Sequence, residues 1–296
     1  MNRTKMNISH INPSPMTPDG RRPMMIGQLL LEMGKLTSDQ LERALALQQK
    51  SGMAFGEAAK KLGFVSESDI QRALAIQFEY SYLPRHEETF SRRLQAAYEP
   101  FSPQVEALRA LRSQLALRWF NQGFKTLAVV AANPGDGCSD LAANLAVVFS
   151  QLGERTLLID ANLRTPEQRK IFKLQQPRGL SDVLIGRNDL SVVCRFDSLK
   201  NLSVLGAGTV PPNPQELLSR RGFAAILDKA REQYDVVIVD TPPAVVTSDA
   251  QAIAANCGGA LLVSQRNLTR MADLANVRDQ LLVCDVQIVA AIVKDS

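Results

Sequence analysis

The sequence predicts an α/β protein whose main domain is a doubly wound, mostly parallel sheet, preceded by a small all-helical repeat domain. The first observation is a series of short apolar runs separated by helical segments, which is typical of parallel strands buried on both faces. The strand signals lie at residues 126–132, 156–159, 202–205, 236–239, 260–263 and 288–293, and helical segments at 214–233 and 268–282. The second observation is a gap-free internal repeat within residues 27–77.

Length and composition exclude several classes of function. With 296 residues, the chain has room for one large domain and one small domain. The net charge of +4 is mild and no basic stripe is interleaved with aromatic residues, so nucleic acid binding is not expected. Four scattered cysteines and two histidines favour neither a zinc site nor a disulfide framework. Because no apolar run approaches the roughly 18 residues of a membrane span, we expect a cytoplasmic protein with a disordered tail over residues 1–24.

The helical repeat domain is predicted over residues 25–84. Gly27–Gln48 aligns with Gly56–Gln77 at an offset of 29 residues, and R-A-L-A-x-Q closes both copies. Each copy is expected to hold two short helices, the second of which starts at a capping box, Thr37–Gln40 in one copy and Ser66–Asp69 in the other. Two such copies packed on each other would bury one face of each helix.

This repeat resembles the N-terminal domain of type II secretion and pilus-extension ATPases, a module that in some members binds cyclic di-GMP. The binding versions carry an arginine just before the Leu-Gly that opens each motif. Here Met25 precedes Ile26-Gly27 and Ala54 precedes Phe55-Gly56, so that arginine is missing from both copies. We therefore expect a protein-docking module, with cyclic di-GMP binding as the alternative.

Residues 85–100 are charged and bounded by prolines, and they predict a linker. The following segment, Pro103–Trp119, predicts a helix that contains E-A-L-R-A-L-R. In it Glu106, Arg109 and Arg112 are spaced three residues apart, close to one face. These side chains form either a solvated face with a local ion pair or a contact between protomers.

The stretch of residues 126–139 carries a signal for phosphate binding. It reads TLAVVAANPGDGCS, an apolar strand followed by a glycine-rich turn, and an apolar helical pattern comes next. The amides of such a turn and the N-terminus of the helix bind anionic oxygens. The P-loop signature G-x-x-x-x-G-K-[ST] matches at Gly137 and Ser139, but Ala132 replaces the first glycine and Cys138 replaces the lysine. We predict a sheet of P-loop NTPase type that binds ATP or ADP through Gly135, Asp136, Gly137, Cys138, Ser139 and Asp140.

An acidic residue ends a further strand in a pattern typical of a metal-binding site. The segment Val236–Pro243, VVIVDTPP, has the form of a Walker B strand. Asp240 is therefore predicted to hold Mg²⁺, with Ser139 as the second contact. The simpler alternatives are that Asp240 caps a turn and that Ser139 is the N-cap of the next helix.

The segment Leu157–Pro166, LLIDANLRTP, narrows the family. Together with Ser139, Asp240 and the E-x-x-R-x-x-R helix it resembles the bacterial tyrosine kinases of polysaccharide synthesis and export, which belong to the MinD and ParA-like group of P-loop ATPases. LGAGTVPPNPQELL and DTPPAVVTSDA extend the match over roughly residues 101–294, so the P-loop domain is placed at 101–296. Within this family the chain looks closest to the soluble chain-length-determinant kinases that carry a repeat domain in front, which would account for residues 25–84 as well.

The resemblance implies ATP binding with Mg²⁺, tyrosine autophosphorylation and self-association through the E-x-x-R-x-x-R helix. It also implies activation by an inner-membrane chain-length-determinant protein, a polysaccharide co-polymerase, which would recruit the chain to the inner membrane. The residues of the family's D-x-D-x-R pattern would be catalytic, and they correspond here to Asp160, Asn162 and Arg164.

Three departures from the family pattern leave catalysis open. Cys138 stands at the lysine that supplies positive charge to the phosphates, and Asn162 replaces the second carboxylate of D-x-D-x-R. No tyrosine follows Tyr234, so the tyrosine cluster that usually ends these kinases is not expected. Arg164, or an arginine of a neighbouring copy, is a candidate source of the missing charge. The alternatives are a weak or inactive kinase, a non-catalytic adaptor of polysaccharide assembly, or a MinD- or ParA-like ATPase.

Overall fold

The computed structural model describes residues 25–77, 83, 88–219 and 221–295, so the predicted tail over 1–24 lies outside the described residues. The chain divides into two units, residues 1–80 and residues 81–296. Each unit has its own hydrophobic core, and each is described by itself below.

The smaller unit contains four helices within residues 25–77: α1 (Ile26–Glu32), α2 (Ser38–Ser51), α3 (Phe55–Lys61) and α4 (Glu67–Gln77). Both expected capping boxes are present. Gln40 N donates to the Thr37 hydroxyl and Asp69 N to the Ser66 hydroxyl, and the side chains of Gln40 and Asp69 accept from the backbone in return. The glycine that opens each copy lies against the same position of the following helix, Gly27 against Leu41 and Gly56 against Ile70. The repeat in the sequence is therefore a repeat in the packing.

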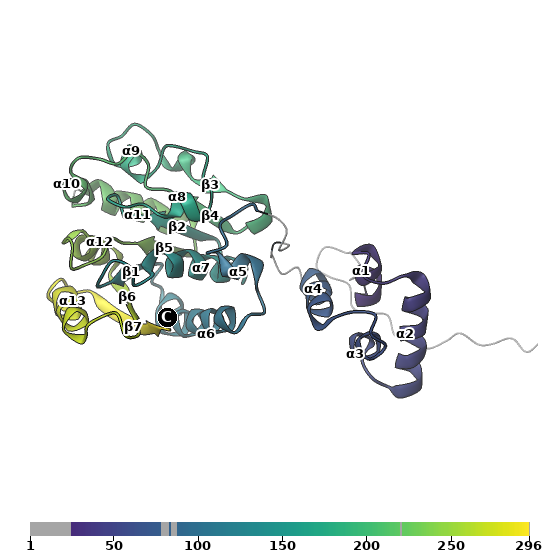
Figure 1. The fold of residues 1–296 in the computed structure, drawn as a ribbon. Helices are drawn as coiled ribbons and strands as arrows, with labels where there is room; N and C mark the ends of the chain where they lie inside the picture. Colours follow the sequence, from purple (N-terminus) through teal and green to yellow (C-terminus); the bar gives the residue numbers. More distant parts are fainter. Residues whose placement is uncertain (1–24, 78–82, 84–87, 220, 296) are drawn as a thin grey trace, which may run out of the picture. The chain divides into compact units, whose positions relative to one another are not determined.

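A seven-stranded sheet forms the centre of the larger unit, in the order β3-β4-β2-β5-β1-β6-β7 (Figure 1). The β3–β4 pair is antiparallel and the other pairs are parallel, which confirms the predicted mostly parallel α/β sheet. The six expected strands are present, and the two-residue β3 was not predicted. The strands are β1 (Thr126–Ala131), β2 (Thr156–Asp160), β3 (Cys194–Arg195), β4 (Leu202–Leu205), β5 (Val236–Asp240), β6 (Gly259–Gln265) and β7 (Gln287–Lys294).

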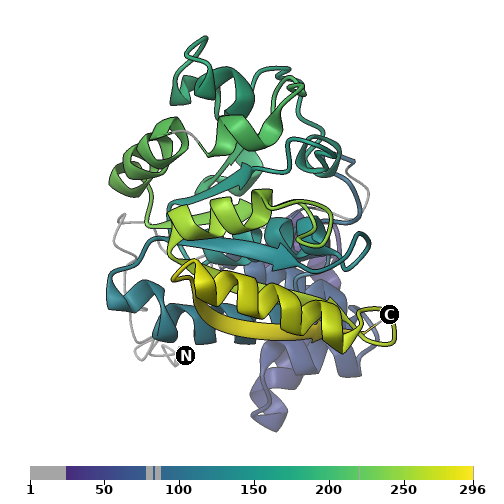
Figure 2. The ribbon, with the colours of Figure 1, turned by 90° about the vertical axis from the view of Figure 1, so that its left-hand side faces the viewer.

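Helices cover both faces of this sheet, because successive strand residues point to opposite sides and both sides are apolar. One face packs against α5 (Gln95–Tyr98), α6 (Pro103–Arg118), α7 (Cys138–Ser150) and α8 (Gln168–Ile171). Figure 2 looks toward the other face, which packs against α9 (Leu180–Leu184), α10 (Pro214–Leu218), α11 (Arg221–Gln233), α12 (Asp249–Cys257) and α13 (Met271–Val283). The sequence predicted one helical segment over 214–233, whereas the structure has α10 and α11 there. The 3-10 turns are η1 (Phe120–Gln122), η2 (Leu190–Val192) and η3 (Asp197–Leu199).

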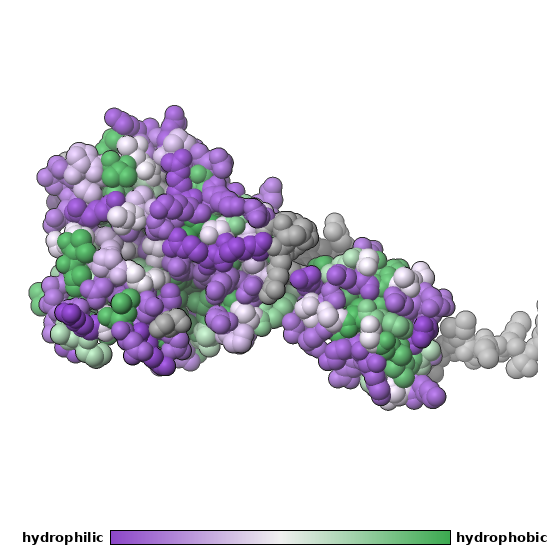
Figure 3. Space-filling model, viewed as in Figure 1, coloured by the Kyte–Doolittle hydropathy of each residue, from purple (hydrophilic) through white to green (hydrophobic). Residues whose placement is uncertain are grey.

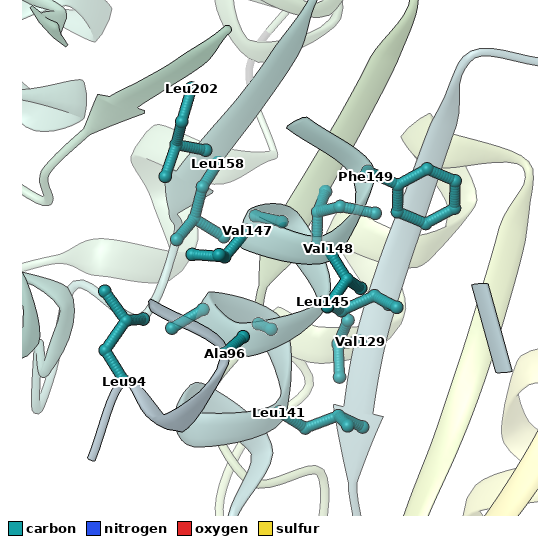
Figure 4. Packing of buried hydrophobic residues seen from close by; sticks show 14 of the residues in the cluster. Leu94, Ala96, Val129, Leu141, Leu145, Val147, Val148, Phe149, Leu158 and Leu202 are labelled. Atoms are coloured by element: carbon teal, nitrogen blue, oxygen red, sulfur yellow. The ribbon is translucent and has the colours of Figure 1, made fainter. Parts of the chain in front are cut away.

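Residues 88–100, the described part of the predicted linker over 85–100, are packed into the larger unit instead of forming a free connection. Phe90, Leu94 and Tyr98 are buried in the core that includes α7. Ala96 N donates to Asn144 Oδ1 on α7 at 2.8 Å, and Figure 4 shows Leu94 and Ala96 beside that helix. The segment is therefore part of the larger unit, held by tertiary contacts that its charged local sequence does not show.

Polar side chains cover much of the larger unit on the face shown in Figure 3, where the apolar residues form small separate groups. Among the described residues, no helix combines the length and hydrophobicity needed to cross a bilayer. The hydrophobic side chains of this unit are mainly used to hold helices on the sheet.

Candidate functional site

The glycine-rich turn lies between β1 and α7, at the carboxyl edge of the parallel strands, where ligands of such sheets bind. Gly135 and Gly137 have φ values of +91° and +79°, in the left-handed region that a side chain disfavours. Gly137 is the N-cap of the 13-residue helix α7, so the amides at the start of that helix face the end of the turn. The predicted phosphate-binding turn thus has the backbone conformation that its glycines allow.

Two of the predicted loop residues have carboxylates that are engaged by the protein itself. Asp136 is fully buried, and it accepts hydrogen bonds from Asn133 N at 2.8 Å and from the Thr269 hydroxyl at 2.7 Å. Asp140 forms an ion pair with Arg93 at 2.7 Å. Asp136 therefore fixes the shape of the turn and Asp140 joins α7 to the segment that precedes α5.

The side chain of Cys138 is directed toward the backbone of β1. Its Sγ lies 3.1 Å from Val129 O, under the loop, and the residue is buried. Burial, and then the nearby negative charge of Asp240, raise the pKa of this thiol well above its usual value. Cys138 is therefore a neutral side chain at neutral pH and carries no charge toward a ligand.

Below the turn lie two buried carboxylates, Asp160 and Asp240, at the ends of β2 and β5. They face each other in the register of the two strands, and both residues are 0% exposed. Asp160 accepts hydrogen bonds from the amides of Asn162 at 3.2 Å and Gln168 at 3.1 Å. The sequence placed each acid at the carboxyl end of a strand, and the structure shows that these strands are neighbours.

A glutamine that the sequence analysis did not single out connects this group. The side-chain amide of Gln168 donates to Asp240 Oδ2 at 2.8 Å and to the backbone oxygen of Ser139 at 3.0 Å. Two buried oxygens beside it, Gln168 Oε1 and Asp240 Oδ1, accept no hydrogen bond from the described residues. The one sequence signal for Gln168 was its position just after the LLIDANLRTP motif. Its residue type gave no signal, because a glutamine is usually exposed.

The two acids hold their protons more tightly than usual. Burial raises the pKa of Asp240 to about 6, although hydrogen bonding with Gln168, Ser139 and Cys138 opposes the shift. Burial, with the charge of Asp240 as the next cause, raises the pKa of Asp160 well above its usual value. An added cation would relieve this electrostatic cost, because it favours the charged form of both acids.

These shifts predict that the free energy of unfolding falls as the pH rises from 5 to 7.5 in the absence of metal and nucleotide. An acid whose pKa is raised on folding binds more protons folded than unfolded, so stability is lost as the pH rises through the folded pKa. Asp240 alone gives a loss of about 1 to 1.5 kcal/mol over this window. Urea denaturation at several pH values measures it. Asp240→Asn is expected to flatten the profile, and an equally steep profile in that variant would contradict the assignment.

The residues proposed from the D-x-D-x-R pattern have separate partners. Arg164 Nε lies 2.8 Å from Asp249 Oδ2, and that carboxylate is buried. Asn162 makes a local turn, because its Oδ1 accepts from Thr165 N at 3.0 Å. Arg164 is thus held by an acid at the start of α12, and its guanidinium is not available as a free charge.

The helix α6 carries the predicted contact residues in two different environments. Arg109 pairs with Glu106 at 2.9 Å, which is the local ion pair that the spacing suggested. Arg112 Nη1 instead donates to Val148 O at the end of α7 at 2.9 Å. Arg112 is therefore partly occupied in fixing α6 to α7.

Comparison with known proteins identifies the family. A family model described as an AAA domain matches residues 124–265. The tyrosine-protein kinase YwqD of Bacillus subtilis is 36% identical over 201 residues, which cover 68% of this chain and 85% of that protein. The tyrosine-protein kinase etk of Escherichia coli is 34% identical over 197 residues, 67% of this chain but only 27% of the relative.

Among solved structures, the kinase domain of the Escherichia coli tyrosine kinase ETK superimposes with a TM-score of 0.67 at 32% identity, covering 74% of this chain and 85% of that one. The match therefore extends from the sequence to the arrangement of the sheet and its helices. On these grounds the chain belongs to the bacterial tyrosine kinase family.

Proposed function

We propose that the chain binds Mg-ATP or Mg-ADP at the turn between β1 and α7 and acts as a cytoplasmic tyrosine-kinase-type component of exopolysaccharide assembly. The observation that carries the proposal is the pair of buried, unpartnered oxygens, Asp240 Oδ1 and Gln168 Oε1, beneath a phosphate-binding turn. Buried oxygens without donors are rare because their desolvation is costly. A magnesium ion with its waters would satisfy both.

The donor set fits magnesium, which binds oxygen ligands and keeps several waters. Asp240 and the hydroxyl of Ser139, which lies beside that carboxylate and favours its charged form, would hold the ion. When bound, Mg²⁺ neutralises charge that develops on the transferred phosphoryl group. Among the described residues no cluster of three or more histidines, cysteines or acids is present, so the ion would depend on phosphate and water for its other ligands.

The protein's own groups would perform the remaining tasks. The amides from Gly135 to Ser139 would bind phosphate oxygens, as helix N-termini do. Asp160 would accept the proton of an attacking tyrosine hydroxyl or orient the metal site, since it is buried next to Asp240. Arg164 and Asn162 would support the segment after β2 rather than touch the phosphates, because their side chains are bonded to Asp249 and Thr165.

The proposed partner is an inner-membrane chain-length-determinant protein, a polysaccharide co-polymerase, which would recruit the chain to the membrane and receive or regulate phosphorylation. Self-association through α6 is proposed as well, because Glu106 is largely exposed on that helix. Both proposals are supported by the resemblance to the polysaccharide kinases and by membership of the tyrosine kinase family. The repeat unit is proposed to dock a protein of the same assembly.

A second candidate function is a non-catalytic adaptor, and the neutral, buried Cys138 is the observation that favours it. In that case the sheet would be a scaffold and the repeat unit the working part. The two candidates differ in whether the purified chain binds nucleotide and transfers phosphate.

Calorimetric titration of the full chain with Mg-ATP and Mg-ADP tests the proposal. We expect binding by the wild type and a loss of affinity of about 10- to 100-fold in Asp240→Ala, because a metal contact is removed. Asp235→Ala is the matched control, since Asp235 immediately precedes the same strand and pairs with Arg155 at its other end. A wild type that binds neither nucleotide would overturn the proposal in favour of the adaptor.

A further inference from the structure

The last residue of β7 lies next to the phosphate-binding turn, although it is more than 150 positions away in the sequence. Lys294 pairs with Gln265 in the register of β6 and β7, and its carbonyl oxygen accepts from Arg266 N at 2.9 Å. The backbone of Lys294 is therefore fixed at the carboxyl edge of the sheet. This is the edge that carries the turn.

Side chains of successive residues in β7 point to opposite faces of the sheet, and this alternation determines the face on which the Lys294 side chain lies. Ala290 and Ile292 pack against the core that contains α7 and Cys138. Lys294 is two residues further along the same strand, so its side chain emerges on the same face. That direction leads to the start of α7.

The side chain reaches Gly137. A Cβ atom placed on this glycine would collide with Lys294 Nζ and would lie 3.2 Å from its Cε and 3.5 Å from its Cδ. The ammonium group and the end of its stem thus rest against the residue that caps α7. Gly137 has no side chain to displace them, so the absence of a Cβ makes this approach possible.

Two arginines near the site are engaged by acids. Arg93 pairs with Asp140 at 2.7 Å and with Glu167 at 2.5 Å, and Arg164 pairs with Asp249. Lys294 has no acidic partner among the residues that the structure describes. A half-buried lysine without such a partner, whose ammonium lies at amides of the kind that bind anions, is positioned for a phosphate oxygen.

We propose that Lys294 supplies the positive charge that Cys138 does not, and that it contacts the phosphates of the bound nucleotide from β7 instead of from the turn. The inference rests on the proposed binding of Mg-ATP and adds a residue to that site. The proposal also explains why a neutral residue is tolerated at position 138. The ammonium of Lys294 reaches the turn from β7, so a second ammonium at position 138 is not required for binding.

The test compares Lys294→Met with Lys200→Met in the full chain, by calorimetric titration with Mg-ATP. Methionine keeps most of the length and the apolar character of the lysine stem but removes its charge. Lys200 is exposed just before β4, at the opposite edge of the sheet, so its replacement controls for the loss of one surface charge. We expect Lys294→Met to weaken binding about tenfold or more, and Lys200→Met to match the wild type.

Two further variants separate a role of charge from a role in packing. Lys294→Arg is expected to keep affinity within a few-fold of the wild type. The double variant Cys138→Lys with Lys294→Met is expected to regain most of the affinity, because the charge returns by the usual route. A merely structural role would not give the recovery in the double variant.

The outcomes for the two proposals are distinguishable. Wild-type binding that Lys294→Met leaves equal to the Lys200→Met control overturns the role of Lys294 and leaves the nucleotide site standing. Absence of binding in the wild type overturns the nucleotide site, and the role of Lys294 with it. Circular dichroism of each variant confirms that the affinity is measured on folded protein.

Discussion

Replacing Cys138 by lysine is expected to raise the rate of ATP-dependent tyrosine phosphorylation by about two to three orders of magnitude, the usual worth of one preorganised group that stabilises transition-state charge. The wild-type thiol is neutral and points at Val129 O, so it contributes no charge that the lysine would replace. The loss of that weak hydrogen bond costs little by comparison. Initial rates with Mg-ATP and a tyrosine-containing peptide measure the change.

The gain should depend on Lys294 if the two side chains act on the same phosphates. We expect Cys138→Lys to raise the rate about 100-fold in the otherwise wild-type chain and about 1,000-fold in the Lys294→Met background. The two effects differ because charges that act on the same phosphates do not contribute additively. Cys138→Met is the control, since it is long and flexible but neutral. Equal rates for Cys138→Lys and Cys138→Met would show that charge at this position does not limit the reaction.

Replacing Gly179 by alanine is expected to destabilise the larger unit by about 3 to 5 kcal/mol, in the range of severe core changes. Gly179 precedes α9 and has an extended φ of −166°, so the conformation itself is open to any residue. The obstacle is space, because an added Cβ would collide with Gly206 O and Gly208 N. Both are backbone atoms of the loop after β4 and cannot rotate away.

The collision would also break the hydrogen bonds that join this loop to α9. Leu180 N donates to Gly206 O at 2.8 Å and Ser181 N donates to Ala207 O at 2.9 Å. Urea denaturation followed by tryptophan fluorescence, excited selectively, reports on this unit alone, because the one tryptophan of the chain, Trp119, is buried in its core.

Gly222→Ala is the matched control for Gly179→Ala. Gly222 lies in α11, where the atoms nearest to an added Cβ are 3.9 Å away, and alanine there is expected to be neutral or to stabilise by up to about 1 kcal/mol. A stability for Gly179→Ala within 1 kcal/mol of this control would refute the steric argument.

The sheet was predictable because its signals are local. Apolar runs such as Val236–Val239 identify buried strands without knowledge of their neighbours, and their alternation with helices predicts that the strands run parallel. The segment 88–100 was not predictable, since Phe90 is surrounded by charged residues in the chain and becomes buried only by contact with Phe172 and Phe196. The antiparallel strand β3 was missed because two residues give no pattern.

The candidate site shows the same division. Asp160 and Asp240 each end an apolar run, so their proximity at one edge of the sheet follows from local sequence and the parallel topology. Gln168 and Lys294 are brought to the site by tertiary structure, and neither belongs to a sequence motif associated with ligand binding. The direction of the Arg164 side chain was equally hidden, because its partner Asp249 lies 85 residues away. The roles of all these residues remain predictions for the experiments above.

The burial of Cys138 also determines how the glycine-rich turn responds to reactive chemistry. Thiols are alkylated and oxidised through their thiolate form, and both burial and a raised pKa suppress it. The turn is therefore protected from peroxide and from electrophiles, unlike redox-controlled sites that expose an acidic cysteine. Of the four cysteines, Cys284 after α13 is the exposed one. A maleimide fluorophore would accordingly attach there and leave the turn unmodified.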